Sequence, residues 1–227
     1  MKIEWIPVTR FEQNCSVLWC ERTGKAVVID PGGDTDRILD VLESETLTLD
    51  RVLVTHGHLD HCGAAGVFAA SMGVPIEGPH IADRPLIDAL GEQGVRGGLR
   101  YARPFMPARW LNQGDRIAFG DVELEVRHCP GHTPGHVAYH HAPSRFAVVG
   151  DILFQGSIGV WKTPRDFLTL FHSIRENLFP LGDDVTFLPG HGETSRFGLE
   201  RQHNPFVSDH AAMRVAELLE QRNGMIR

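Results

Sequence analysis

The stretch Thr55-His56-Gly57-His58-Leu59-Asp60-His61 places three imidazoles and one carboxylate within its last six residues. The apolar run that leads into it, residues 51–55, predicts a buried strand. In an extended loop, residues two apart project to the same side, so His56 and His58 can bind one ion together. The stretch therefore predicts a metal site directly after a buried strand.

Asp60 and His61 lie at the turn into a predicted helix. They are expected to point in a different direction from His56 and His58, and so suit a second ion. The remaining ligands occur in three short segments, Pro-Gly-His132, Gly-Asp151 and Pro-Gly-His191, each of which follows a predicted strand. Strand ends bring side chains that are distant in sequence to one rigid edge of a sheet. The predicted assignment gives the first ion His56, His58 and His132, gives the second ion Asp60, His61 and His191, and makes Asp151 the bridge.

This ligand set predicts a catalytic centre with two divalent ions. Imidazole and carboxylate without thiolate suit zinc, our first choice, and equally permit iron or manganese. Three protein ligands and a bridge leave open positions for water. Two ions about 3.5–4 Å apart would hold a hydroxide between them, because metal binding lowers the pKa of water toward about 7. The expected reaction is hydrolysis, with Asp60 also orienting the hydroxide.

Three further side chains are candidates for holding the ligands in place. Asp30, in Asp-Pro-Gly-Gly, is either a turn former, the commoner case, or a hydrogen-bond partner of the metal-binding loop. Thr55 directly precedes the motif. His136, four residues after His132, either orients a ligand or simply begins the next strand. His203, beside the predicted helix start at Asn204, could also reach the site, and the remaining histidines show no partner pattern.

Length and charge restrict the class of protein. A chain of 227 residues with 22 Lys+Arg and 29 Asp+Glu suits a single domain, residues 1–227, and its formal charge of −7 argues against a nucleic-acid partner. The sequence has no stretch of about 20 apolar residues and no signal-peptide layout at its start, so we expect a cytoplasmic protein without a membrane partner. The four cysteines form no CxxC pair and are expected to be buried free thiols.

Apolar runs and turn residues predict an α/β fold with two β-rich halves, each followed by helices. This order favours a four-layer αββα sandwich, with two facing sheets and helices outside. The predicted strands are 16–20, 26–29, 51–55, 74–77, 116–119, 122–127, 137–141, 145–149 and 185–188. The predicted helices are 36–44, 60–72, 81–90, 166–178 and 204–221, the last capped by Asn204, and a long loop is expected up to residue 111.

The motifs at 55–61, 130–136, 150–151 and 189–192 resemble the metallo-β-lactamase superfamily. Together with Asp-Pro-Gly-Gly and His-Asn-Pro-Phe, they are most similar to glyoxalase II, or hydroxyacylglutathione hydrolase, and above all to its short single-domain bacterial relatives. The resemblance runs from about Ile6 to Phe206. It implies the αββα fold, a dinuclear site of the seven ligands named above, and hydrolysis of the thioester S-lactoylglutathione to lactate and glutathione.

Two departures bear on the substrate. Longer glyoxalases carry a further C-terminal helical domain with glutathione contacts, which we do not expect in a chain of this length. Val160 stands where relatives place a basic residue, so either Lys162 compensates, or Val160 and Trp161 line a pocket for a more apolar acyl thioester.

The substrate is thus expected to be a small-molecule thioester, such as a glutathione conjugate, with the protein a monomer or homodimer. One alternative function is a persulfide dioxygenase with a single iron at His56, His132 and Asp151. Others are a hydrolase of another substrate, such as a lactone, and a non-catalytic metal-binding protein with the loop 96–109 as its contact surface. The sequence leaves open whether the segment 78–111 caps the site or forms a dimer.

Overall fold

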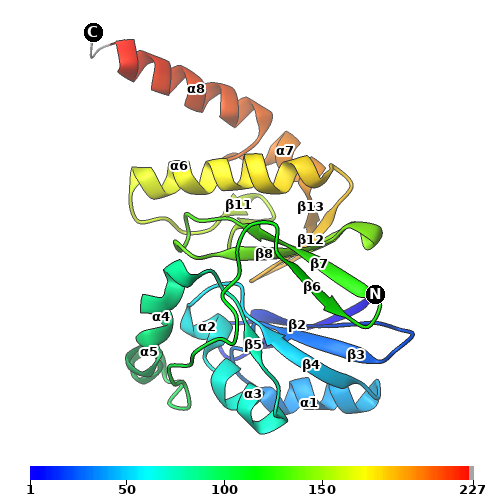
Figure 1. Ribbon diagram of the computed structural model, residues 1–227. Coiled ribbons are helices and arrows are strands. Elements are labelled where there is room, and N and C mark those ends of the chain that lie inside the picture. Colours follow the sequence, from blue (N-terminus) through cyan, green and yellow to red (C-terminus); the bar gives the residue numbers. More distant parts are fainter. Residues whose placement is uncertain (225–227) are drawn as a thin grey trace.

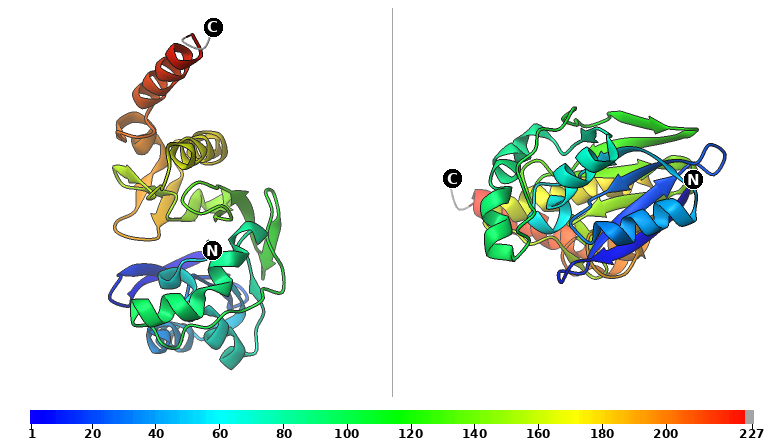
Figure 2. Two further views of the ribbon diagram at one scale, coloured as in Figure 1. Left: turned by 90° about the vertical axis from the view of Figure 1, so that its left-hand side faces the viewer. Right: turned by 90° about the horizontal axis from the view of Figure 1, so that it is seen from below.

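Two β-sheets packed face to face form the centre of the computed structural model, which describes residues 1–224 (Figure 1). The first sheet has the strand order β1-β2-β3-β4-β5, and the second has the order β13-β12-β9-β8-β7-β6. Helices cover the outer face of each sheet, as the turned views in Figure 2 show. The expected four-layer αββα sandwich is therefore confirmed.

The first half of the chain forms the first sheet. Its strands are β1 (Lys2–Val8), β2 (Gln13–Trp19), β3 (Lys25–Ile29), β4 (Thr48–Leu53) and β5 (Ile76–Glu77). The first three pair antiparallel, and β4 and β5 are added in parallel. The sequence does not predict β1, because this edge strand exposes Trp5 and contains Pro7, which breaks the usual strand pattern.

The helices of this half differ from the prediction in three places, one of which is the helix expected at 81–90, which is divided into a 3₁₀ turn and a short α-helix that ends at Asp88. They are α1 (Thr35–Ser44), α2 (Leu59–Cys62), α3 (Ala65–Met72), α4 (Arg84–Asp88) and α5 (Leu90–Gly97), with a 3₁₀ turn at Ile81–Asp83. The helix expected at 60–72 is thus two helices, α2 and α3. The loop expected after residue 90 begins with α5, whose Gly94 is buried where a Cβ would lie 2.6 Å from the carbonyl oxygen of Leu99. Gly94 and Gly97, which suggest a loop here, serve close packing.

The second half of the chain forms the second sheet. Its strands are β6 (Arg116–Phe119), β7 (Val122–His128), β8 (Val137–His141), β9 (Phe146–Gly150), β12 (Thr186–Pro189) and β13 (Ser195–Arg196), and β10 (Leu153–Phe154) pairs separately with β11 (Ser157–Ile158). Both predicted hairpins, β6–β7 and β8–β9, are confirmed. Because β12 lies parallel to β9, their carboxyl ends are neighbours.

Helix α6 (Pro164–Ser173) covers this sheet and continues as a π-helical turn, Ile174–Leu178. The helix predicted from Asn204 is wrong in its start. Asn204 instead ends α7 (Phe197–His203), where its side-chain amide donates to Ser157 and Glu200, and α8 (Asp209–Gly224) begins later and points away from the sandwich (Figures 1 and 2). The predicted run at 204–221 thus covers the turn after α7 and most of α8.

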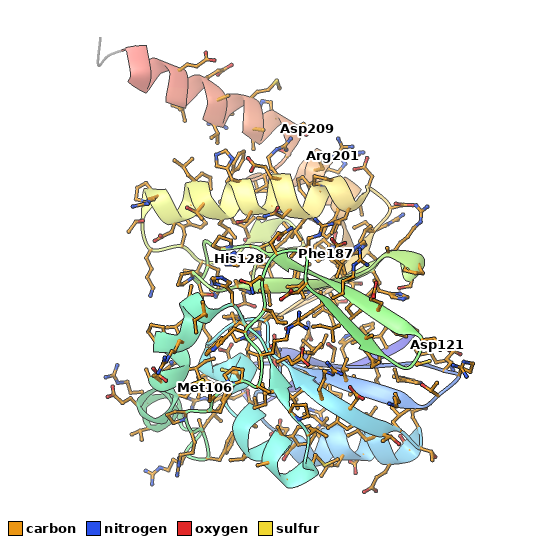
Figure 3. All side chains as sticks on the ribbon, viewed as in Figure 1. Met106, Asp121, His128, Phe187, Arg201 and Asp209 are labelled. Carbon is orange, nitrogen blue, oxygen red and sulfur yellow. The ribbon has the colours of Figure 1, made fainter. Side chains whose placement is uncertain are left out.

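Apolar side chains fill the spaces between the layers. Leu53 of β4 and Tyr139 of β8 belong to the buried cluster between the two sheets. Phe187 of β12, labelled in Figure 3, is buried on the helix-covered side and stacks on Phe197 of α7 at a ring-centroid distance of 5.3 Å. All four cysteines are free and buried, as expected. In residues 1–224, no helix combines the length and the apolar character needed to span a membrane.

Candidate metal centre

Four strand ends bring the predicted ligands together. The segment that follows β4 carries His56 and His58, the loop after β7 carries His132, Asp151 follows β9, and His191 follows β12. The first two come from one sheet and the others from its partner. The site therefore lies where the two halves of the sandwich meet.

The first cluster consists of His56, His58 and His132. The Nδ1 atom of His58 lies 3.0 Å from Nε2 of His56 and 3.0 Å from Nε2 of His132. All three donor atoms lie within 4.8 Å of one another, a spacing that suits a shared ion. Burial lowers the pKa of His56 well below its ordinary value, which keeps this imidazole neutral and able to donate its lone pair.

The second cluster consists of Asp60, His61 and His191. The Oδ2 atom of Asp60 lies 3.2 Å from Nε2 of His191 and 3.8 Å from Nε2 of His61. Asp60 and His61 occupy the first turn of α2, and the backbone N–H of His61 donates to the carbonyl of His58. The short helix thus places these two ligands beside His191, while the His61 ring also lies 4.1 Å, between centroids, from that of His56.

Asp151 lies between the clusters. Its Oδ1 atom is 3.2 Å from Nε2 of His61, and its Oδ2 atom is 3.7 Å from Nε2 of His132 and 3.8 Å from Nε2 of His191. Gly190 makes room for it, since a Cβ there would lie 2.1 Å from Oδ1 of Asp151. One carboxylate therefore reaches both clusters, as the predicted bridge requires.

Asp30 and Thr55 hold the start of the metal-binding loop. The carboxylate of Asp30 accepts hydrogen bonds from the backbone N–H of Thr55 at 2.7 Å and from the Thr55 hydroxyl, and its Oδ2 lies 2.8 Å from Nδ1 of His61. Asp30, His56 and His61 are also close enough to form a third metal-binding group. Because the oxygens of Asp30 already accept these hydrogen bonds, the structure favours the orienting role over direct ligation.

His136 contacts both parts of the site. Its Nε2 accepts a hydrogen bond from the backbone N–H of Asp151 at 3.0 Å, and its ring stacks on that of His56 at a centroid distance of 4.4 Å. A Cβ at Gly150, whose φ is +51°, would lie 2.6 Å from the His136 ring. His136 directly precedes β8 and also supports the strand end that carries Asp151.

Sequence patterns miss several groups that orient the ligands. The Nδ1 of His191 lies 3.1 Å from the carbonyl oxygen of Phe11, and the Nδ1 of His132 lies 2.9 Å from that of Val160. The Asn14 side chain donates to the carbonyls of Pro189 and Gly192 at 3.0 and 2.9 Å. Backbone carbonyls leave no trace in the sequence, but the polar Gln13-Asn14 pair at the start of a buried strand was a usable signal.

Two buried atoms test whether the site fits metal ions. In the part of the chain that the structure describes, Nε2 of His61 and Oδ1 of Asp151 lie 3.2 Å apart, but neither atom makes a well-aligned hydrogen bond. An unpartnered buried polar atom is costly, so both atoms call for a ligand. Burial lowers the pKa of His61, but the Asp151 and Asp30 carboxylates outweigh it and hold the pKa well above its ordinary value, so this pocket favours positive charge. The donor set therefore fits divalent cations.

A cleft of about 360 Å³ adjoins the first cluster and is lined by His132, Lys162 and Thr169 among others. Val160 and Trp161 are not among its lining residues. The side chain of Val160 is exposed, and the Trp161 ring packs against Phe167 and Phe206 at centroid distances of 5.2 and 5.7 Å. Of the three residues expected near the substrate, the structure thus brings only the Lys162 side chain to this cleft.

Comparison with known proteins assigns the family. Residues 8–191 match the sequence pattern described as the metallo-beta-lactamase superfamily. The chain belongs to this superfamily. Its resemblance to hydroxyacylglutathione hydrolase GloC of Haemophilus influenzae, 44% identical over 210 residues, covers 92% of this chain and 99% of that one. This superfamily member is therefore glyoxalase II-like and a metal-dependent hydrolase.

Solved structures support the same superfamily assignment. The BLEG-1 B3 metallo-beta-lactamase superposes with a TM-score of 0.81 at 31% identity, covering 91% of this chain and 99% of that one. TTHA1623, solved in a di-iron-bound form, superposes with a TM-score of 0.79 at 31% identity, covering 89% of this chain and 99% of that one.

Proposed function

We propose that this protein is a dinuclear thioesterase of the hydroxyacylglutathione hydrolase type, acting on S-lactoylglutathione or a related acyl thioester. The observation that carries the proposal is the position of Asp151 between two complete ligand clusters. The name of the GloC relative supports the thioester class. We also propose that residues 1–227 act as one catalytic domain in the cytoplasm.

The two clusters, Asp151 and Asp60 would have different roles in this reaction. The first cluster would hold one ion, the second cluster the other, and Asp151 would contact both. When bound, two divalent ions supply an acidified water as nucleophile and polarise the thioester carbonyl. Asp60 keeps part of its carboxylate exposed, and although burial opposes ionisation, His191 and His61 lower its pKa. It is therefore an ionised acceptor that can orient the attacking water.

The proposed metal is zinc, with iron or manganese as alternatives, because imidazole and carboxylate donors accept all three. Lys162 places a positive charge in the cleft beside His132. This position suits the carboxylates on the glutathione-like part of a thioester substrate. The acyl group of the same thioester would then face the clusters.

The test combines metal analysis with an activity screen. Purified protein is analysed for zinc, iron and manganese, and then assayed with S-lactoylglutathione, other acyl thioesters, lactones, a β-lactam and glutathione persulfide. We expect two ions per chain and hydrolysis of thioesters in preference to the other substrates. Fully loaded protein without thioester hydrolysis would contradict the proposal, and oxygen uptake with glutathione persulfide at a single iron would replace it by a dioxygenase.

A further inference from the structure

Asp83 is a buried carboxylate outside the predicted ligand set. It ends the 3₁₀ turn Ile81–Asp83, in the segment 78–111 whose role the sequence leaves open, and its side chain has no exposed surface. It forms no ion pair with a lysine or arginine within residues 1–224. A buried carboxylate without a cationic partner is costly unless hydrogen bonds satisfy it, so its hydrogen bonds indicate what it does.

All three of its side-chain hydrogen bonds go to the loops of the first cluster. Its Oδ2 accepts from the backbone N–H of Gly57 at 2.9 Å and from the hydroxyl of Thr133 at 2.8 Å. Its Oδ1 accepts from the backbone N–H of Gly135 at 2.6 Å. Gly57 lies between His56 and His58, and Thr133 directly follows His132. One carboxylate therefore connects the two loops that carry all members of this cluster.

The backbone packs equally closely around Asp83. A Cβ at Gly57 would lie 3.2 Å from the Asp83 carbonyl oxygen, and a Cβ at Gly135 would lie 2.5 Å from the Asp83 nitrogen. His80, at the start of the same turn, donates its backbone N–H to the carbonyl of Gly135. The turn at 80–83 thus fits against both loops and fixes their separation.

The second cluster has different supports. Asp30 contacts His61, and the carbonyl of Phe11 contacts His191, while no hydrogen bond joins Asp83 to Asp60, His61 or His191 in the described part of the chain. Among the described residues, the Asp83 side chain therefore contacts only the loops of the first cluster, whereas Asp30 contacts His61 and also the backbone of Thr55, at the start of the loop that carries His56.

We infer that Asp83 is a positioning residue that sets the affinity of the first cluster for its ion. It does so by holding the loop of His56 and His58 at a fixed distance from the loop of His132. The inference rests on the proposed function in one respect, since it takes the first cluster to be a cation site. Outer-shell groups of this kind change metal affinity by about 10–100-fold when removed.

The experiment titrates metal-free protein with Zn²⁺ in competition with a chromogenic chelator. Asp83→Asn should weaken one binding step by about 10–100-fold and leave the other step nearly unchanged. The matched control is Asp88→Asn, five residues along the same segment, whose exposed carboxylate faces Arg84 and should affect neither step. Equal weakening of both steps, or no weakening, would overturn the inference.

Two single variants, each lacking one histidine of one cluster, show which cluster accounts for the weakened Zn²⁺-binding step. In His191→Ala, which keeps the first cluster intact, adding Asp83→Asn should weaken the remaining Zn²⁺ site. In His58→Ala, which keeps the second cluster intact, the same change should have no effect, and the reverse result would refute the inference. These measurements need no turnover. A protein that hydrolyses no thioester would therefore refute the proposed function, while the role of Asp83 would still be decided by the Zn²⁺ affinities.

A milder variant covers the case in which Asp83→Asn does not fold. Thr133→Val keeps the shape of a buried side chain and removes only its hydrogen bond to Asp83. It should weaken the same step to a smaller extent, whereas Thr133→Ser, which restores the hydroxyl, should recover the affinity. Unchanged affinity in Thr133→Val would contradict the inference, because this hydrogen bond joins Asp83 to the residue next to His132.

Discussion

The Nδ1 atom of His61 lies 2.8 Å from Oδ2 of Asp30, and the opposite nitrogen of the same ring faces Asp60 and Asp151. The carboxylate of Asp30 therefore fixes which nitrogen of His61 is available to an ion. Since Asp30 also accepts from the backbone N–H of Thr55, the ring and the end of β4 are held by one side chain.

Replacing Asp30 by asparagine should weaken the second cluster. The amide has one acceptor oxygen and an NH2 group that only donates, so it cannot accept from Thr55 and His61 through both positions as the carboxylate does. We expect Zn²⁺ affinity to fall by about 10–100-fold. Activity measured against free Zn²⁺ should therefore require more metal. The exposed Asp36→Asn on α1 is the control, and an unchanged zinc dependence in Asp30→Asn would contradict the assigned role.

Asp151→Ala should abolish most of the turnover while the fold is retained. The substitution removes the only carboxylate in the described residues that lies within 4 Å of ligand nitrogens from both clusters. We expect kcat to fall by about 100-fold or more, as for loss of a preorganised charge in other active sites. Metal content and the circular dichroism spectrum are measured together, and retained turnover with one ion per chain would exclude the dinuclear mechanism.

Metal removal should lower stability as well as activity. An ion that binds only the folded state at 100 times its Kd contributes about 2.7 kcal/mol. For a chain of this size, that corresponds to a rise in Tm of roughly 5–11 °C when Zn²⁺ is restored to chelated protein. Differential scanning calorimetry with and without Zn²⁺ checks this. Magnesium, which prefers oxygen ligands, is the control ion and should give little change.

Lys162→Gln should raise KM for anionic thioesters and leave kcat unchanged. The side chain lines the cleft but lies at the surface, so its charge contributes at most about 1 kcal/mol, or roughly 5-fold in KM. The difference should shrink as salt is added. Lys25→Gln is the matched control, because Lys25 is the first residue of β3 and so lies at the end of that strand away from the site. A change in kcat alone would indicate a role in the chemical step instead.

The stability of metal-free protein should depend on His80 at mildly acidic pH. Burial and the His128 ring, stacked at 4.2 Å, lower the pKa of His80, although Asp83 partly opposes this, and its Nδ1 accepts a hydrogen bond from the backbone of Ala82. The unfolded chain, with a histidine pKa near 6.5, therefore binds a proton more readily than the folded one, and stability falls as pH drops through that value.

His80→Gln removes this titration and should flatten the loss of stability between about pH 7.5 and 5.5. Urea denaturation of the metal-free protein at several pH values measures the slope. His128→Gln removes the facing ring and should act in the same direction but more weakly. A steeper slope in His80→Gln would show that the sign is wrong.

The clustering of the proposed ligands could be predicted from sequence because each of them lies in a short motif after a strand end. His56 and His58 are neighbours along the chain, and His132, Asp151 and His191 each follow a glycine after a predicted strand. The same local reasoning predicted most strands and both hairpins. It failed where local signals conflict with packing, as in the glycine-rich α5 and at Asn204, which ends one helix instead of beginning another.

The supporting residues could not be predicted because their partners are distant. Asp83 binds Gly57 and Thr133, which are 26 and 50 residues away, and its own surroundings are those of an ordinary helix start. Asn14 contacts the loop of His191 across more than 170 residues. Such contacts exist only once the two sheets have come together.

Because the proposed ligands are spread over both sheets, the two clusters are completed at different times while the chain is being synthesised. A ribosome releases the segment 56–61 well before residue 132, and His191 comes out last. The first cluster cannot be completed until residue 132 has left the ribosome, and the second cannot be completed until residue 191 has. The first cluster is therefore complete before most of the second sheet has been made, whereas the two-ion site is complete only once β12 and His191 have been added.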